Sequence, residues 1–258
     1  ILNKKNIDKQ TLKIIEKNDD YDVLLGLAGV ALQSAKKVLD KKKIFICERS
    51  SSEIGYQNRL LAEEYKICNR NYKPTNSWFI DNEQKEYELA DIILTPSNFV
   101  KNSFNKNLED KIKVINFGVN TDNFYTDKSI KKSDKYFDIL FIGQISIRKG
   151  LHYLLEAFHK FKHPHKRLHI VGSHSFDKDF FIKKLNDDNI KYYGHVNHLE
   201  LNKIINKCHV FVLPSIEEGF ATVILQALSA GCPVIVSENT GAMEFVNDNK
   251  CGYVVPIR

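Results

Sequence analysis

Residues 214–231, PSIEEGFATVILQALSAG, indicate the fold most clearly. It overlaps the end of CHVFVLPS (208–215), a short apolar run rich in Val and Phe that is typical of a buried strand. Apolar residues then recur at helical spacing, and Gly231 with Pro233 ends the predicted helix. CPVIVSE (232–238) predicts the next strand. The order strand, loop, helix, strand indicates an α/β unit, and in open α/β sheets ligands bind at the loops that follow the strands.

Two carboxylates, those of Glu217 and Glu218, stand at the start of this predicted helix. Acidic side chains there complement the positive end of the helix dipole and contribute roughly a few tenths of a kcal/mol. Because the same loop lies at a predicted ligand edge, a direct role in binding is the alternative interpretation.

A second candidate site lies in FIGQISIRKG, residues 141–150, where a strand ends at Gly143 and a helix begins near Lys149. Backbone amides at such a junction favour an anion, and Arg148 and Lys149 would strengthen the site. The alternative is that the two basic side chains only face water. The sequence contains no P-loop and no G-x-G-x-x-G pattern, so the phosphate signal depends on the two strand ends taken together.

Length and composition set outer bounds on the class of protein. The chain has 258 residues with 43% hydrophobic content, enough for one large or two ordinary cores, and no run is long and apolar enough to span a bilayer. Its five cysteines show no metal-ligand spacing, which favours reduced core residues in a cytoplasmic protein. The net charge of +6 comes from scattered lysines, which usually face solvent; contact of a basic flank with the inner face of a membrane is the alternative.

Strand-like and helix-like segments alternate twice along the chain. The first set of predicted strands is YDVLLGL (21–27), KIFICE (43–48), DIILTPS (91–97) and KVINFG (113–118), with helices around 30–40, 57–67, 78–90 and 97–106, the last capped by Ser97. The second set is FDILFIG (137–143), RLHIVG (167–172), IKYYG (190–194), HVFVLPS (209–215), CPVIVSE (232–238) and GYVVP (252–256). We therefore predict two doubly wound α/β domains, 1–118 and 137–258, joined by a polar linker, 119–136.

These motifs carry a family resemblance. FIGQISIRKGLHYLLEAF, LHIVG, KYYGHV, VFVLPSIEEGFATVILQALSAGCPVIVSENTGAMEFV and CGYVVP resemble the nucleotide-sugar-binding half of retaining glycosyltransferases of family 4, in the glycosyl transferases group 1. CERSSSEIGYQNRLLAEEYK, EYELADIILTPSNFVKNSF and INFGVNTDNF are similar to the acceptor-side half. The resemblance implies the GT-B fold, two Rossmann-like domains facing across a cleft. Against that pattern we expect the chain to be truncated at both ends.

The resemblance also implies roles for individual residues. Family members have a glutamate that reaches the donor sugar and, eight positions later, a glutamate that reaches the ribose; here these positions hold Glu218 and Gln226. Glu218, Lys149 and Arg148 are the implied catalytic residues, the two cations neutralising the diphosphate. The other implied donor-binding residues are Gly143, Gln144, Gly172, Val196, Gly219, Phe220, Ala221 and Thr222, with Gln144 at a position where the family often has arginine.

The position of Glu218 has a physical explanation on this interpretation. Phosphate belongs at the helix start, so we expect Glu218 to turn toward sugar hydroxyls and Glu217 to face solvent or brace the loop. Eight residues of helix advance about 12 Å, which is roughly the distance from a donor sugar to its ribose.

The resulting hypothesis is retaining transfer of a sugar, a hexosyl group, from a nucleoside-diphosphate sugar to a hydroxyl of a glycan, lipid or small molecule. It involves no metal or other cofactor and no nucleic acid, and peripheral membrane contact stays open. One alternative is a catalytically silent nucleotide-sugar-binding or scaffold subunit, which Gln226, Gln144 and Glu53 favour because related sequences often carry Glu, Arg and His there. A second alternative is a phosphorylase or epimerase of the same fold. A retaining glycosidase, with two carboxyl groups about 5 Å apart, would leave the basic site unexplained.

Overall fold

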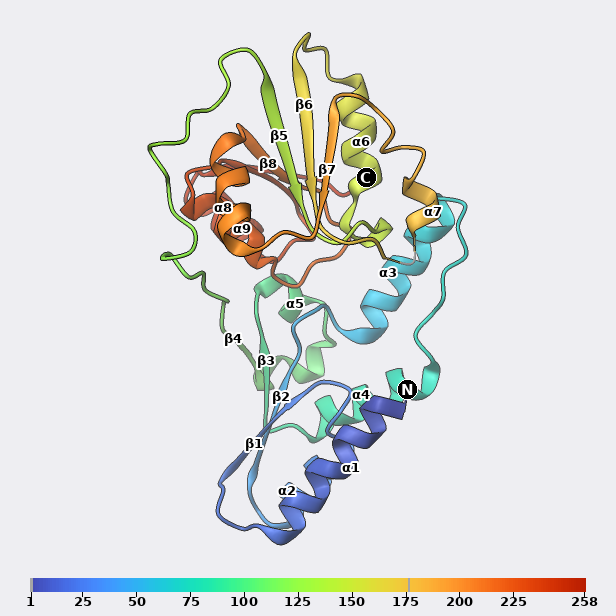
Figure 1. Cartoon of the computed structure of the whole chain (residues 1–258). Helices are drawn as coiled ribbons and strands as arrows, with labels where there is room; N and C mark the ends of the chain where they lie inside the picture. Colours follow the sequence, from blue (N-terminus) through green and yellow to red (C-terminus); the bar gives the residue numbers. More distant parts are fainter. Residues whose placement is uncertain (1, 176) are drawn as a thin grey trace. The chain divides into compact units, whose positions relative to one another are not determined.

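The computed structural model describes residues 2–175 and 177–258, and the chain divides into two compact units, 1–116 and 117–258. Each unit contains one parallel sheet flanked by helices (Figure 1). The predicted pair of α/β domains is therefore confirmed. No helix within the described ranges is long and apolar enough to cross a bilayer.

The first unit has a four-stranded parallel sheet with the order β1-β2-β3-β4. Its strands are β1 (Val23–Leu27), β2 (Ile44–Glu48), β3 (Ile92–Thr95) and β4 (Ile112–Val114). Its helices are α1 (Leu2–Lys17), α2 (Leu32–Asp40), α3 (Ile54–Ile67), α4 (Ser77–Leu89), α5 (Asn98–Asn102) and a 3-10 turn (Lys106–Lys111). All four predicted strands are present, though β4 ends at Val114 rather than at residue 118.

Side-chain caps explain where three of these helices begin. The side chains of Glu53, Asn76 and Ser97 accept hydrogen bonds from the first turns of α3, α4 and α5, which satisfies N–H groups that have no partner inside the helix. The predicted cap at Ser97 is thus confirmed. The helix that it caps ends at Asn102 rather than near residue 106, and a 3-10 turn follows.

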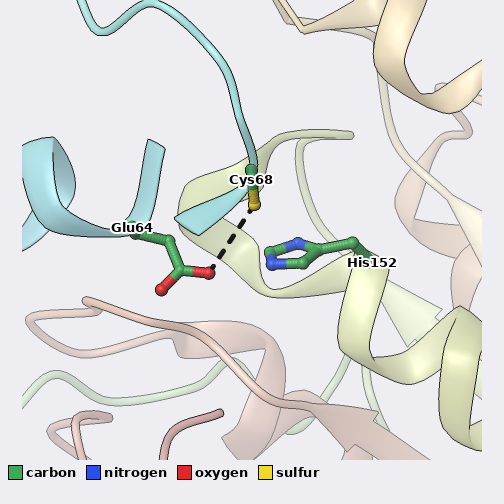
Figure 2. A group of neighbouring side chains, drawn as sticks. All are labelled: Glu64, Cys68 and His152. Atoms are coloured by element: carbon green, nitrogen blue, oxygen red, sulfur yellow. Dashed lines mark hydrogen bonds between the residues drawn. The ribbon is translucent and has the colours of Figure 1, made fainter. Parts of the chain in front are cut away.

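Helix α3 ends at a local contact between two polar side chains. The Cys68 thiol, at the helix C-cap, donates to Glu64 Oε1 at 3.9 Å, one turn earlier, as Figure 2 shows. His152, also drawn there, belongs to α6 of the second unit. The Glu64 side chain is buried, so the thiol donates to a group that solvent does not reach.

The second unit has a six-stranded parallel sheet with the order β10-β9-β8-β5-β6-β7. Its strands are β5 (Phe137–Ile142), β6 (Lys166–Val171), β7 (Ile190–Gly194), β8 (Val210–Leu213), β9 (Val234–Ser237) and β10 (Gly252–Val255). Its helices are α6 (Leu151–Lys160), α7 (Lys178–Phe181), α8 (His198–Lys207), α9 (Thr222–Ser229), α10 (Met243–Asp248) and a 3-10 turn (Ile147–Lys149). All six predicted strands are present.

The strand order of the second sheet is that of a Rossmann fold. Counted from β5, the order runs 3-2-1-4-5-6, and it reverses between β5 and β8, which pair in parallel. Figure 1 shows α6 to one side of these strands and α8 with α9 to the other. Ligands of such sheets bind where the strand order reverses, so a binding site is expected at the loops after β5 and β8.

Residues 119–136, predicted to be a linker, pack within the second unit. The backbone N–H groups of Tyr125 and Asp127 donate to the side chains of Asn202 and Asn206, at 3.2 and 2.8 Å. These two asparagines lie in α8 and are buried. The segment therefore has fixed partners on the second sheet's helices.

Candidate functional site

The loops that follow β5 and β8 are held together by a close backbone contact. Ile216 N–H donates to the Arg148 carbonyl at 2.9 Å. Gly150 has a φ of +67°, and a Cβ there would lie 1.8 Å from the Pro214 carbonyl oxygen. Only glycine fits this position, because a side chain would both strain the backbone and push the two loops apart. The contact fixes the turn that carries Arg148 and Lys149 beside the loop that carries Glu218.

A second glycine brings β5 and β6 together at the same edge of the sheet. A Cβ on Gly172, which has a φ of +143°, would lie 1.9 Å from the Gly143 carbonyl oxygen. The N–H of Gly143 donates to Val171 O and the N–H of Gly172 to Gly194 O, at 2.9 and 2.8 Å. Both predicted glycines thus lie at the carboxyl ends of neighbouring strands.

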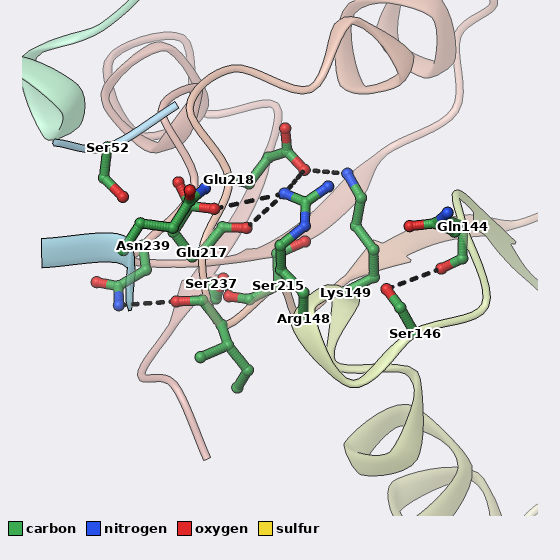
Figure 3. Close-up of polar contacts among 12 residues, drawn as sticks. Ser52, Gln144, Ser146, Arg148, Lys149, Ser215, Glu217, Glu218, Ser237 and Asn239 are labelled. Atoms are coloured by element: carbon green, nitrogen blue, oxygen red, sulfur yellow. Dashed lines mark hydrogen bonds and ion pairs between the residues drawn. The ribbon is translucent and has the colours of Figure 1, made fainter. Parts of the chain in front are cut away.

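Arg148, Lys149 and Glu218 form one charged cluster, which Figure 3 shows. The Lys149 ammonium forms a close ion pair with Glu218 Oε2, and Arg148 Nη1 lies 3.5 Å from the same oxygen. Arg148 Nη1 also donates to the Glu217 carbonyl at 3.1 Å and lies 3.5 Å from Glu217 Oε2. Two cations and two carboxylates from separate strand ends therefore meet at the point where the strand order reverses.

Burial changes the electrostatics of this cluster. The Lys149 and Glu218 side chains are each only 12% exposed. Removal from water lowers the pKa of Lys149, while the charge of Glu218 acts in the opposite direction. The ammonium therefore depends on a nearby anion, and Glu218 supplies it.

Glu217 is buried and does not face solvent, which decides between the two predicted roles. Its carbonyl and carboxylate both lie within reach of Arg148, so it braces the loop. Part of the sequence-based explanation for Glu218 is wrong, because α9 begins at Thr222 and only part of the interval from Glu218 to Gln226 is helical. An advance of about 1.5 Å for each of eight residues therefore does not apply.

The start of α9 has no side-chain cap. Ala221 holds the N-cap position and offers no side-chain cap, and the N–H of Ile224 already donates to the Ala221 carbonyl at 3.0 Å. The N–H groups that precede Ile224 in this first turn can therefore meet an anion. Phe220, just before it, is 7% exposed and packs edge-on against Phe117 with ring centres 5.9 Å apart. The GFAT segment (219–222) is thus fixed by its aromatic residue, next to Glu218.

Gln226 lies one turn into α9 and carries an unsatisfied buried acceptor. Its Oε1 is inaccessible to solvent and has no hydrogen-bond partner within residues 2–175 and 177–258. Buried polar atoms without partners are rare and costly in native proteins, and they commonly mark a place where a ligand or water binds. Gln226 therefore does not simply point into solvent.

The remaining predicted residues lie at the same edge of the second sheet. Gln144 follows β5 and is exposed, and its carbonyl accepts from Ser146 Oγ at 3.4 Å. Val196 is half-buried in the connection from β7 to α8. Both follow the carboxyl ends of strands, together with Gly143 and Gly172.

Three further residues shape this edge and were not predicted. Asn239, after β9, donates through Nδ2 to Ile216 O at 2.9 Å and holds the Glu218 loop. Asp177 accepts from Ile147 N–H at 3.0 Å and orients the basic turn. His174, after β6, has a buried Nδ1 with no partner in the described part of the chain. A polar residue within three positions of the end of an apolar strand was the available signal for Asn239 and His174, but not for Asp177, which lies just before α7.

Comparison with known proteins gives the family. The sequence profile of the glycosyl transferases group 1 family matches residues 122–258, more than half of the chain. An uncharacterized glycosyltransferase of Methanocaldococcus jannaschii is 34% identical, over 76% of this chain and 52% of its own length. The capsular polysaccharide biosynthesis glycosyltransferase CapM of Staphylococcus aureus is 28% identical, over 64% of this chain and 48% of its own.

Solved structures show the same fold. Sucrose-phosphate synthase from Thermosynechococcus elongatus has a TM-score of 0.78 at 18% identity, covering 99% of this chain and 66% of its own. HepE from Anabaena, solved with UDP and glucose, has a TM-score of 0.72 at 18% identity, covering 96% of this chain and 67% of its own. The two parallel sheets and these matches confirm the predicted GT-B fold class.

The chain spans about half the length of the curated relatives it matches. The family profile covers the whole second sheet, including both loops at the point where its strand order reverses. The chain belongs to the family of group 1 glycosyl transferases.

Proposed function

We propose that the second unit binds a nucleoside-diphosphate sugar and that the protein transfers its sugar to an acceptor hydroxyl. The observation that carries the proposal is the meeting of Arg148, Lys149 and Glu218 where the strand order of a Rossmann-like sheet reverses. HepE, which shares this fold, was solved with UDP and glucose, and such a ligand is the chemistry that this arrangement suits.

In this proposal the cations serve the leaving group. Arg148 and Lys149 neutralise the diphosphate, aided by the uncapped start of α9, and so stabilise charge that develops as the sugar departs. Two cationic side chains supply this charge without a metal ion, so we propose transfer that needs neither a metal nor another cofactor. The bond from the anomeric carbon to the diphosphate oxygen breaks, a bond to the acceptor oxygen forms, and the proton of the acceptor hydroxyl passes to the departing diphosphate.

In this proposal Glu218 contacts the sugar of the donor and Gln226 contacts its ribose. When phosphates replace Glu218 as the anion beside Lys149, the carboxylate is free to accept from sugar hydroxyls. The orphaned Oε1 of Gln226 accepts from a ribose hydroxyl, and the edge near Gly172, His174 and Val196 receives the base. Resemblance to family 4 supports a hexosyl donor and retention at the anomeric carbon.

The acceptor belongs to the envelope or to small-molecule metabolism in this proposal. Relatives named for capsular polysaccharide and colanic acid biosynthesis support a glycan or lipid-linked acceptor. A lipid-linked acceptor would hold the reaction at a membrane surface, so we propose a cytoplasmic protein that works at or near the inner face of the membrane.

The test is a panel of nucleoside diphosphates and their hexosyl derivatives, measured first by thermal shift and then by transfer to an acceptor mixture. We expect one nucleotide series to stabilise the protein selectively and Glu218→Gln, a nearly isosteric change, to keep folding while it cuts transfer. Stabilisation without transfer would support the silent binding subunit. Sugar phosphate release by inorganic phosphate, or epimerised donor, would support the phosphorylase or epimerase.

A further inference from the structure

A separate cavity of about 320 Å³ lies in the first unit, where β1 ends. Its walls are formed by helices α1 and α4, the connection from β1 to α2 and the start of α2. The residues that decide its chemistry are Asp8, Lys9, Gln33, Trp78, Asn82 and Glu86. Ligand pockets begin at about 300 Å³, so this volume suits one small ring rather than a chain of several.

Two carboxylates take up the backbone donors at this end of α2. Glu86 accepts from the N–H groups of Gly29 and Ala31, at 2.5 and 2.8 Å. Asp8 accepts from the N–H groups of Gln33 and Ser34, at 2.8 and 2.9 Å. A helix start normally attracts an anion, but here the protein's own carboxylates already occupy it.

The lining therefore disfavours a phosphate or another anion. Asp8 and Glu86 are 8% and 1% exposed and already hold the N–H groups that an anion would need, while Lys9 in the same lining is exposed. The Asp8 carboxylate would also repel an anion in this half-buried site. The occupant that fits is electrically neutral.

The other groups in the lining match a ring that carries hydroxyls. Trp78 is 42% exposed and offers a large flat apolar surface. Asn82 is half-buried, and its side-chain amide makes no hydrogen bond among the residues that the structure describes. A primary amide donates and accepts at once, as a hydroxyl does, so Asn82 can bond neighbouring hydroxyl groups.

We infer that this cavity binds one neutral sugar ring, with its apolar face on Trp78 and its hydroxyls on Asn82. Assigning that sugar to the acceptor rests on the proposed function, whereas the binding itself does not. The cavity is built from residues of the first unit alone, so it is a binding site distinct from the charged cluster around Lys149.

Trp78 is the one tryptophan of the sequence, so its fluorescence reports directly on this cavity. The full chain is titrated with the methyl glycosides of glucose, galactose, mannose and N-acetylglucosamine, by emission and by calorimetry. We expect saturable binding of at least one glycoside, with a Kd on the order of 1 mM. Methyl glucuronide, the anionic probe, should bind about tenfold more weakly or not at all.

Two variants distinguish binding in this cavity from a nonspecific effect of the glycoside on the protein. Asn82→Ala should weaken binding about fivefold, the worth of one hydrogen bond, while Asn102→Ala, an exposed control in α5, should leave it unchanged. The inference is overturned if no glycoside binds by either method, if the glucuronide binds as tightly, or if both variants lose affinity equally. Nucleoside diphosphate titrated into the same sample tests the proposed function separately.

Discussion

The side chains of Arg148, Lys149 and Glu218 share one small, partly buried volume of the second unit. Removing one partner of a buried ion pair costs more free energy than removing one partner of a surface pair, because the remaining charge is left buried without compensation. Glu218 pairs with both cations, and Arg148 also contacts Glu217. In the proposed function, a diphosphate brings stronger negative charge and takes over the contacts of Glu218.

Lys149→Ala should weaken the binding of a nucleoside diphosphate by about 1.5 to 3 kcal/mol, the range for hydrogen bonds to charged groups. The uncharged nucleoside should bind almost as before, because it presents no phosphate to Lys149. Calorimetry with both ligands measures the difference, and Lys160→Ala, whose side chain is 75% exposed, is the control. Equal losses for nucleotide and nucleoside would mean that Lys149 is structural.

Gln226→Glu should tighten nucleotide-sugar binding by about 0.5 to 1.5 kcal/mol, since a carboxylate accepts from two ribose hydroxyls more strongly than one amide oxygen does. The Oε1 of Gln226 is buried and has no hydrogen-bond partner within the described residues, and the added charge would act at this position. The gain should shrink for a 2′,3′-dideoxy nucleotide, as calorimetry can measure. No gain, or the same gain with the dideoxy compound, would remove Gln226 from the ribose site.

At this scale the sequence indicated the functional residue types but not their contacts. Adjacent Arg148 and Lys149 after one strand, and Glu218 after another, predicted one ligand edge. The bond from Lys149 to Glu218 depends on two loops about seventy positions apart, and no local pattern encodes it. The buried position of Glu217 was open for the same reason.

At the scale of elements, the turn after β5 depends on Gly150. Gly150→Ala should lower the free energy of unfolding by about 2 kcal/mol or more, in addition to the strain of a positive φ. The reason is that the new Cβ would clash with the Pro214 backbone. Gly194→Ala is the matched control, since Gly194 has a φ of +70° and a Cβ added there would have no atom within 4 Å. Thermal unfolding of both variants compares them, and equal losses of stability would contradict the docking of the two loops.

The start of α2 makes the first unit sensitive to pH. Burial, opposed by hydrogen bonds from Ala31 and Gly29, raises the pKa of Glu86 from 4.5 to about 7. A carboxyl whose pKa is raised by folding stabilises the protein below its unfolded pKa, and this contribution is lost as pH rises from about 4.5 through about 7.

Between pH 5 and pH 8, the free energy of unfolding of the wild type should therefore fall by about 2 kcal/mol more than that of the Glu86→Gln variant. Urea unfolding followed by the fluorescence of Trp78 measures it, because this tryptophan lies in the first unit. A difference between the two proteins that stays constant over this pH range would contradict the shifted pKa.

Strands were easier to predict than helices. Most strands contain a short apolar run, such as the buried core of β5, and such runs stand out without knowledge of their neighbours. Helix α1 was not predicted, because its apolar residues do not form one face at helical spacing. Ile15 is buried, whereas Ile7 and Ile14 face solvent. The start of α9 lies four residues after Glu218, because the loop is fixed by tertiary contacts rather than by helical preference.

At the scale of the whole chain, each compact unit has its own sheet and its own candidate site. The second unit carries the charged cluster where its strand order reverses, and the first carries the cavity where β1 ends, for which we infer a neutral ring. Strand order cannot be read from a sequence of alternating elements, because pairing is decided by long-range packing. The reversal between β5 and β8, on which the proposed donor site depends, is therefore a structural finding.

In the proposed function, a nucleoside-diphosphate donor binds at the edge formed by the loops after β5 and β8. Amide hydrogen exchange on the full chain, with and without a saturating nucleoside diphosphate from the panel, tests it most directly. We predict slower exchange in residues 143–150 and 214–226, which hold the basic turn, Glu218 and the start of α9. Slower exchange confined to other segments, or no nucleotide that slows exchange in these two, would contradict the claim.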